Sequence, residues 1–276
     1  MNSSTESARP TFDAHVHIAS RDTGRYPFTP TAVGSTWWHD PVDVDDLLRA
    51  MDGADVERAV VVQAVGAYGY DNRYLLDACA AHLDRLVAIA AVRDPQLIDD
   101  VSARPGVVGL RGFLVGGVER ELIAAALERF PTVVLTGFLE QLDPLVDLVA
   151  LHPSVPVLID HCGFPDWTLA TGAVSPAEAW PTLARLAVLS NTRVKFTGHS
   201  MHCTDDPDAA FAAVTRLFGP ERVIAGSDFP QTKQDYAATW TALRRLDPSG
   251  QFTGENARRL WPDAGAPLRF EPPVLQ

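Results

Sequence analysis

From residue 11 onward, short runs rich in Val, Ile and Phe alternate with longer amphipathic stretches rich in Ala, Leu, Asp and Arg. Such alternation is typical of βαβ units that build a parallel sheet. The predicted strands cover residues 12–17, 59–65, 86–92, 107–114, 133–136, 157–161, 193–197 and 223–228. The predicted helices cover residues 44–51, 72–82, 95–102, 119–130, 139–151, 176–189, 207–218 and 235–246. Eight strand and helix pairs in 276 residues predict an α/β protein with one (β/α)8 TIM barrel, a fold that takes about 250 residues.

A doubly wound open sheet is the alternative to this barrel. Neither GxGxxG nor GxxxxGK[ST] follows the first predicted strand, so a nucleotide cofactor has no sequence support. No linker or repeat divides residues 11–276, which are expected to form one domain after a disordered, polar tail at residues 1–10. The long connection at 18–41 carries several aromatic residues, so we expect a somewhat distorted barrel whose first loop covers or walls a pocket.

Charge and cysteine content restrict the partners and the compartment. A net charge of −12, from 23 basic and 35 acidic residues, disfavours nucleic acid and anionic membrane surfaces as partners. Three cysteines at unrelated spacings indicate neither a disulfide framework nor a CxxC zinc site. With no secretory leader and no run near about 18 apolar residues, we expect a soluble cytoplasmic protein. A homo-oligomer stays open, because an apolar helix face could serve a dimer.

Several histidines lie in or at the ends of predicted strands, where (β/α)8 barrels have their active sites. His15 and His17 are two apart in the first predicted strand, so both imidazoles lie on one face, and the lumen suits them better than a position under apolar helices. His161 and Asp228 end the strands at 157–161 and 223–228. Active sites of such barrels lie at the carboxyl ends of the strands. We therefore expect these four residues to converge and to bind one divalent ion, with Zn²⁺ the best match, or to act without a metal.

Cationic and polar residues near other strand ends suggest a small anionic substrate. Arg111 ends the fourth predicted strand and Arg93 follows the third, and a guanidinium matches carboxylate geometry, although a surface ion pair is an equal alternative for Arg93. Lys195, inside the seventh strand, needs a carboxylate partner or a substrate anion. His199 follows that strand and is predicted to line the pocket. Cys162 is predicted to pack away from the lumen rather than act as a nucleophile.

Several strings spread over the chain carry a family resemblance: FDAHVHI (12–18), VVGLRGF (107–113), VLIDHCGFP (157–165), RVIAGSDFP (222–230) and FTGENARRLW (252–261). On these the sequence resembles the amidohydrolase superfamily, amidohydrolase 2 type, in the branch of 2-pyrone-4,6-dicarboxylate lactonase and the sugar-acid and muconolactone lactonases. The resemblance implies that His15 and His17 are the first-strand pair, His161 the sixth-strand histidine and Asp228 the carboxylate that activates water. It also implies that Arg111 and Tyr68 hold the substrate's carboxylate or ring.

The scarcity of lysine limits the metal centre that the resemblance implies. Two-metal members bridge their ions through a carboxylated lysine on a middle strand, but no lysine precedes Lys195 here, so at most one ion is expected. The predicted reaction is hydrolysis of a carboxylate-bearing lactone by water that Asp228 deprotonates, with the imidazoles stabilising the oxyanion directly or through one metal. The alternatives are a non-oxidative decarboxylase of an aromatic or muconate-type acid, and a catalytically silent barrel that binds a ligand.

Overall fold

A computed structural model describes residues 11–31, 36–117, 120–171 and 174–262, and in it eight strands form one parallel sheet in the order β1 to β8. They are β1 (Thr11–Val16), β2 (Val56–Val62), β3 (Leu86–Ala90), β4 (Val107–Phe113), β5 (Val133–Thr136), β6 (Val157–Ile159), β7 (Thr192–Thr197) and β8 (Val223–Gly226). The sheet closes where the Asp228 amide donates to the His15 carbonyl oxygen and the His17 amide to the Phe229 carbonyl oxygen, each at 2.8 Å. The predicted (β/α)8 barrel is confirmed.

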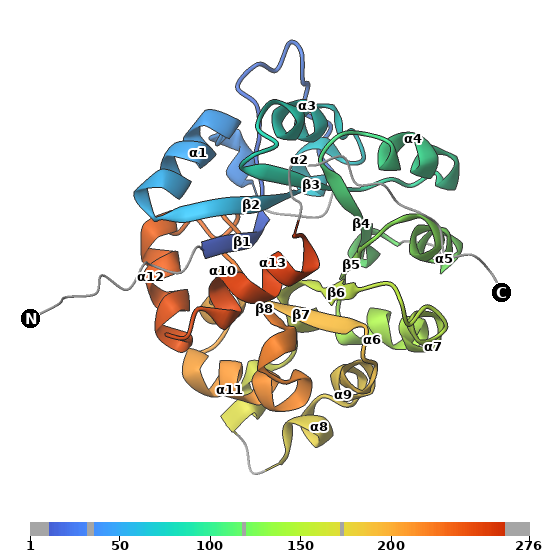
Figure 1. Cartoon of the computed structure of the whole chain (residues 1–276), viewed down its shortest axis with the longest axis vertical. Coiled ribbons are helices and arrows are strands. Elements are labelled where there is room, and N and C mark those ends of the chain that lie inside the picture. Colours follow the sequence, from blue (N-terminus) through green and yellow to red (C-terminus); the bar gives the residue numbers. More distant parts are fainter. Residues whose placement is uncertain (1–10, 32–35, 118–119, 172–173, 263–276) are drawn as a thin grey trace, which may run out of the picture.

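Helices surround this sheet on the outside, and α13 lies across one end of the barrel (Figure 1). They are α1 (Val44–Gly53), α2 (Val65–Tyr68), α3 (Arg73–Ala81), α4 (Ile98–Ser102), α5 (Arg120–Arg129), α6 (Leu139–Leu142), α7 (Val146–Ala150), α8 (Pro176–Ala179), α9 (Pro181–Val188), α10 (Gly198–His202), α11 (Pro207–Phe218), α12 (Tyr236–Leu246) and α13 (Asn256–Leu260). Aspartates begin three of the longer ones: the side chains of Asp43, Asp206 and Asp235 accept backbone N–H groups in the first turns of α1, α11 and α12.

Three predicted helices are shorter or broken in the structure. The predicted helix at 139–151 is divided into α6, a 3-10 turn at Asp143–Leu145 and α7. The one at 176–189 breaks between α8 and α9 at Trp180, and the one at 95–102 begins as a 3-10 turn at Pro95–Leu97. Pro144, Pro181 and Pro95 lie at these points, and proline supplies no backbone N–H to continue a helix. Helices α2, α10 and α13 were not predicted from the sequence, and none of them is longer than five residues.

Two apolar layers hold the barrel together, one between the strands and the helices and one inside the lumen. In the lumen, Trp261 stacks on Phe12 with ring centroids 5.9 Å apart and closes the end that α13 covers. The other members are Ala14, Val60, Val62, Val87, Ile89, Val108, Val134, Leu158, Ile224 and Ala257. Because this plug fills the amino-terminal half of the lumen, the polar side chains gather at the carboxyl ends of the strands.

The long connection after β1 is anchored by aromatic contacts. Trp37 is 7% exposed and stacks on the imidazole of His17, with ring centroids 6.2 Å apart, while Phe28 packs on Tyr68 at 5.2 Å. Residues 32–35 of this connection, and the predicted tail at 1–10, lie outside the described residues. Within the part of the chain that the structure describes, no helix has both the length and the hydropathy to cross a membrane.

Candidate active site

His15 in β1 and His17 directly after this strand are buried, and each is held in one tautomer. His15 Nδ1 lies 3.2 Å from Asp160 Oδ1, and His17 Nδ1 lies 2.8 Å from the carbonyl oxygen of Val62. A carboxylate and a carbonyl oxygen only accept hydrogen bonds, so each Nδ1 carries the proton. The Nε2 atom of a neutral ring held in this way presents a lone pair.

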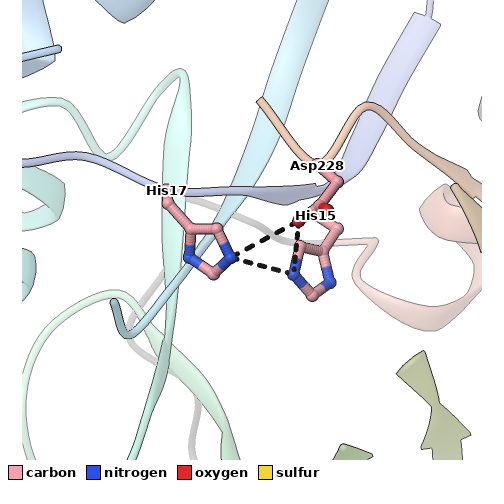
Figure 2. A group of neighbouring side chains, drawn as sticks. All are labelled: His15, His17 and Asp228. Atoms are coloured by element: carbon pink, nitrogen blue, oxygen red, sulfur yellow. Dashed lines mark hydrogen bonds and ion pairs between the residues drawn. The ribbon is translucent and has the colours of Figure 1, made fainter. Parts of the chain in front are cut away.

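These two lone pairs meet a carboxylate. The Nε2 atoms of His15 and His17 are 3.2 Å apart, and each lies 3.5 Å from Asp228 Oδ1 (Figure 2). Burial lowers the pKa of His15 to about 3, so this imidazole is neutral near neutral pH. Both carboxylate oxygens of Asp228 are buried without a hydrogen-bond partner among the described residues. Two ring nitrogens and a carboxylate oxygen, all able to donate an electron pair, thus face one another, an arrangement that a cation stabilises.

The donor set fits a divalent metal. Ligand atoms of His15, His17 and Asp228 lie within 4.8 Å of one another, and two imidazoles with one carboxylate are ligands that Zn²⁺ accepts. The hydrogen bonds of the two Nδ1 atoms are the outer contacts that orient metal-binding histidines. His161 belongs to a second such group, with His15 and Asp160. The four predicted ligands are therefore neighbours, and three of them offer atoms to one position.

His161 is directed by a strained turn after β6. Its backbone φ is +52° and that of Cys162 is +56°, both in the left-handed region that side chains other than glycine rarely adopt. Asp228 shares this strain, with φ of +58°. Such strain persists where the surrounding structure imposes it, and it is concentrated at functional sites. The turn places His161 Nδ1 at 2.7 Å from Thr197 Oγ1, while Cys162 points back and donates its thiol to the Lys195 carbonyl oxygen at 3.5 Å.

Asp160 lies at the centre of the polar cluster, although no role was predicted for it. Its Oδ1 lies 3.0 Å from Lys195 Nζ, and its Oδ2 accepts the Thr136 hydroxyl at 2.6 Å and lies 3.5 Å from Arg111 Nε. Burial alone would raise the pKa of Asp160, but the charge of Lys195 and the contact with His15 outweigh it and hold this pKa well below 3.8. The sequence contains a signal for this ion pair. A lysine inside a strand needs an anionic partner, and Asp160 comes directly after the neighbouring strand β6.

A second carboxylate without a predicted role fixes the closure of the barrel. Asp13 Oδ1 accepts the backbone N–H groups of His15 and Ser227 at 3.0 and 2.9 Å, and its Oδ2 accepts the Tyr236 hydroxyl at 3.0 Å. Burial raises the pKa of Asp13 to about 6 despite these hydrogen bonds. Asp13 therefore ties β1 to the segment that carries Asp228, outside the lumen.

A cavity of about 200 Å³ opens above these groups. Its polar lining includes His17, His161, His199, Asp228, Arg111 and Thr136, and its other lining residues are Trp37, Ala64, Val65, Gly66, Phe113, Val115, Phe138, Phe164 and Gln231. Burial by itself would raise the pKa of Asp228, but the neighbouring imidazoles, His161 foremost, lower it. Asp228 is thus a charged carboxylate at the floor of a cavity that can hold a small molecule.

Of the five residues predicted to bind substrate, the structure brings two to this cavity. Arg111 and His199 line it. Lys195 is fully buried beneath it in the pair with Asp160, so its partner is a carboxylate of the protein. Tyr68 lies outside the lining, where its hydroxyl accepts the Ser20 amide at 2.7 Å and anchors the long loop. Arg93 is exposed and lies over the ring of Tyr70, also outside the lining.

Comparison with known proteins decides the family. A family model described as Amidohydrolase matches residues 12–262. The chain belongs to the amidohydrolase family. The resemblance seen in its motifs is thereby confirmed, and the roles that it implies for His15, His17, His161 and Asp228 in this amidohydrolase stay predictions. No curated protein sequence matches the chain.

Solved structures share the fold of this amidohydrolase. A Burkholderia multivorans amidohydrolase with bound zinc is 21% identical with a TM-score of 0.73, and the match covers 92% of this chain and 99% of that chain. A probable 2-pyrone-4,6-dicarboxylic acid hydrolase from Acinetobacter baumannii with bound citric acid is 21% identical with a TM-score of 0.69, covering 91% and 99%. The 2,6-dihydroxybenzoate decarboxylase from Rhizobium is 16% identical with a TM-score of 0.61, covering 92% and 98%.

Proposed function

We propose that this amidohydrolase opens a carboxylate-bearing lactone by hydrolysis. The observation that carries the proposal is the Asp228 carboxylate, which is charged, buried and without a hydrogen-bond partner among the described residues, in the same cavity as Arg111. A base of this kind can take a proton from water, and a guanidinium can hold a substrate carboxylate. The structural similarity to the A. baumannii hydrolase agrees with this reaction class.

Asp228 moves the protons in this scheme. As the water oxygen forms a bond to the ester carbonyl carbon, an Asp228 carboxylate oxygen accepts the water proton. When the bond between that carbon and the ring oxygen breaks, Asp228 returns the proton to the departing alkoxide, and the product is a hydroxy acid. No oxidant or other reactant is needed. Arg111 Nη2 makes no hydrogen bond to a described residue, so it is available to orient the substrate carboxylate.

His161 is suited to stabilise the oxyanion. The Thr197 hydroxyl oxygen accepts the Ser200 amide at 3.3 Å, which leaves its hydrogen free to donate to His161 Nδ1 at 2.7 Å. Burial lowers the pKa of His161 well below 6.5, so the ring is neutral, and when the Thr197 hydroxyl donates to Nδ1 the ring proton resides on Nε2. That N–H can donate to the oxygen of the tetrahedral intermediate. His15, His17 and Asp228 would hold a divalent ion, whose chemistry is Lewis acidity toward the carbonyl and the water.

The test is a panel of lactones incubated with the purified chain, with Zn²⁺ and after chelation. Proton release, followed at constant pH, should appear with carboxylated lactones and should be lost in Asp228→Asn. Absence of hydrolysis across the panel, in both metal states, contradicts the proposal. If activity survives complete removal of metal, the imidazoles alone stabilise the oxyanion.

A decarboxylase is the second candidate, favoured by the similarity to the Rhizobium enzyme and by the aromatic walls of the cavity. It would release CO₂ from an aromatic acid rather than a proton from a lactone. Measuring both products on lactones and on 2-hydroxybenzoate-like acids separates the two reactions. The cytoplasmic location, a homo-oligomer and the expectation of no nucleic-acid or membrane partner stay predictions.

A further inference from the structure

In the described part of the chain, a single cationic side chain lines the cavity. Lys195 and Asp160 form a buried pair at 3.0 Å beneath it, which leaves Arg111 and the Asp228 carboxylate as the two oppositely charged side chains of the described lining. Among the described residues that line the cavity, Arg111 is the only arginine or lysine. It is 4% exposed and its orientation is fixed, because Nε donates to Thr136 Oγ1 at 2.8 Å and Nη1 donates to the Gln63 carbonyl oxygen at 2.9 Å.

The walls of the cavity are largely apolar. Phe113 packs against the Arg111 guanidinium, which lies 5.0 Å from the ring centroid, and Phe138 and Phe164 contact each other with centroids 5.2 Å apart. Trp37 and Val65 complete these walls. Flat apolar rings pack well on such surfaces. At about 200 Å³, the cavity is smaller than the about 300–1,000 Å³ that is usual for drug-sized ligands.

Under the proposed function His17, His161 and Asp228 act on the lactone carbonyl and the water, which leaves few side chains of the described lining to bind substrate hydroxyl groups. His199 is one of them, and its Nε2 lies 3.3 Å from Cys203 Sγ. The Thr136 hydroxyl donates to Asp160 and accepts from Arg111, so it has no proton left for a ligand. Gln231 is the one uncharged amide side chain of the described lining. Each ligand hydroxyl buried without a partner weakens binding. A polyhydroxylated ring is therefore poorly matched to this cavity.

A second cation lies outside the cavity. Lys233 lines a separate hollow of about 580 Å³, and Trp37 belongs to the lining of both spaces. Lys233 is exposed to solvent, whereas Arg111 is buried. A second carboxylate on a small ring held by Arg111 would therefore face the aromatic walls rather than Lys233.

We propose that the substrate is a small, flat, apolar ring with a single carboxylate, that Arg111 binds this carboxylate, and that the aromatic walls discriminate against dicarboxylates and sugar-acid lactones. This inference rests on the proposed function for the reaction. What it adds is which ligands the cavity selects. It departs from what similarity to a pyrone-dicarboxylate hydrolase would suggest, because that substrate carries two carboxylates.

Binding can be measured apart from turnover with lactams, which resist hydrolysis. We would titrate the full chain by calorimetry with 2-pyridone-5-carboxylate, 2-pyridone-4,6-dicarboxylate and gluconolactam. The monocarboxylate should bind about 10- to 100-fold more tightly than either of the others, since they bury an unpaired carboxylate or unpaired hydroxyl groups. Equal or tighter binding of the dicarboxylate or of gluconolactam would overturn the proposal.

Two variants and one control assign the selectivity to residues. Arg111→Met should weaken binding of the monocarboxylate about 10- to 100-fold, whereas Lys233→Met, the control, should leave it unchanged. Phe138→Arg places a second cation at the rim, where Phe138 is 46% exposed, and should improve binding of the dicarboxylate relative to the monocarboxylate. Comparable losses in Arg111→Met and Lys233→Met would contradict the assignment.

The ligand ranking and Phe138→Arg still decide the question if Arg111→Met fails to fold, which circular dichroism would reveal. Failure of the reaction is a separate outcome. If the lactams rank as expected and no lactone is hydrolysed, the proposed function is wrong and the selectivity holds. If lactones are hydrolysed with a preference for dicarboxylates, the selectivity is wrong and the function holds.

Discussion

The Nε2 atoms of His15 and His17 lie 3.2 Å apart as two lone pairs, because their Nδ1 protons are engaged by Asp160 and by the Val62 carbonyl oxygen. Asp228 Oδ1 lies 3.5 Å from both nitrogens. Repulsion among three acceptors in a buried site is relieved by a cation. The hydrogen bonds at the Nδ1 atoms of the two rings therefore decide that both Nε2 atoms are available to a metal ion.

The first prediction is that the chain binds one Zn²⁺ and that His17→Ala abolishes stoichiometric binding. Losing an outer partner of a metal-binding histidine weakens affinity about 10- to 100-fold, so loss of a ligand should weaken it more. Metal content after dialysis and calorimetric titration measure the effect. His152→Ala, a histidine remote from the site, serves as the control. Retention of one ion per chain by His17→Ala would exclude this metal position.

Asp228→Asn is expected to lower kcat about 10²- to 10⁴-fold, the usual contribution of a general base. The fold should persist, since the Asp228 carboxylate makes no hydrogen bond to a described residue that the amide would lose. Initial rates with the best lactone and a thermal melt measure the two quantities. Asp205→Asn, at an exposed position, controls for the change of charge. Turnover within a few-fold of the unmodified protein would remove Asp228 from the mechanism.

Asp160→Asn should destabilise the fold by about 3–5 kcal/mol, because it leaves Lys195 buried with its charge uncompensated. Adding Lys195→Met to this variant should recover part of the loss, since the orphaned ammonium is then gone. Urea denaturation gives both values. Asp208→Asn, which breaks an exposed pair with Arg245, should change little and is the matched control. Equal stability of Asp160→Asn and the unmodified protein would show that the pair is not required.

Gly226→Ala is expected to disturb the site through backbone packing. A Cβ at Gly226 would lie 2.7 Å from His15 Cβ, so β8 and β1 must separate or His15 must move. Overpacking of this kind costs about 1–3 kcal/mol, and it should also reduce Zn²⁺ binding. Gly53→Ala, where the added Cβ meets nothing within 4 Å, is the control and should be neutral or stabilising by about 0.4–1 kcal/mol. Similar midpoints of urea denaturation for the two variants would disprove this effect.

Strand periodicity was sufficient to place much of the site. Because side chains alternate along a strand, His15 and His17 could be assigned to one face, and strand ends of a barrel meet at one rim, which brought His161 and Asp228 to them. The same alternation fails for Asp13. The pairing of β1 with β2 shifts between Asp13 and Val16, and Asp13 faces Tyr236 outside the lumen rather than sharing the side of His15.

Contacts between distant segments could not be predicted in this way. Tyr68 was expected near substrate and instead anchors the first loop, because its hydroxyl meets Ser20, 48 residues away along the chain. Asp160 belongs to the VLIDHCGFP motif but had no predicted role, because its contacts involve four partners from four different strands. Contacts between residues so far apart in the chain cannot be predicted from strand periodicity in a single sequence.

The sequence by itself determined the barrel and the placement of the histidine pair on one face of a strand, because these follow from local periodicity. Only the tertiary structure decided which nitrogen of each imidazole is free, which carboxylate neutralises Lys195, and that Arg111 alone among the described lining residues carries a permanent positive charge. Those properties depend on distances of about 3 Å between residues far apart in the chain, and only the closure of the barrel sets such distances.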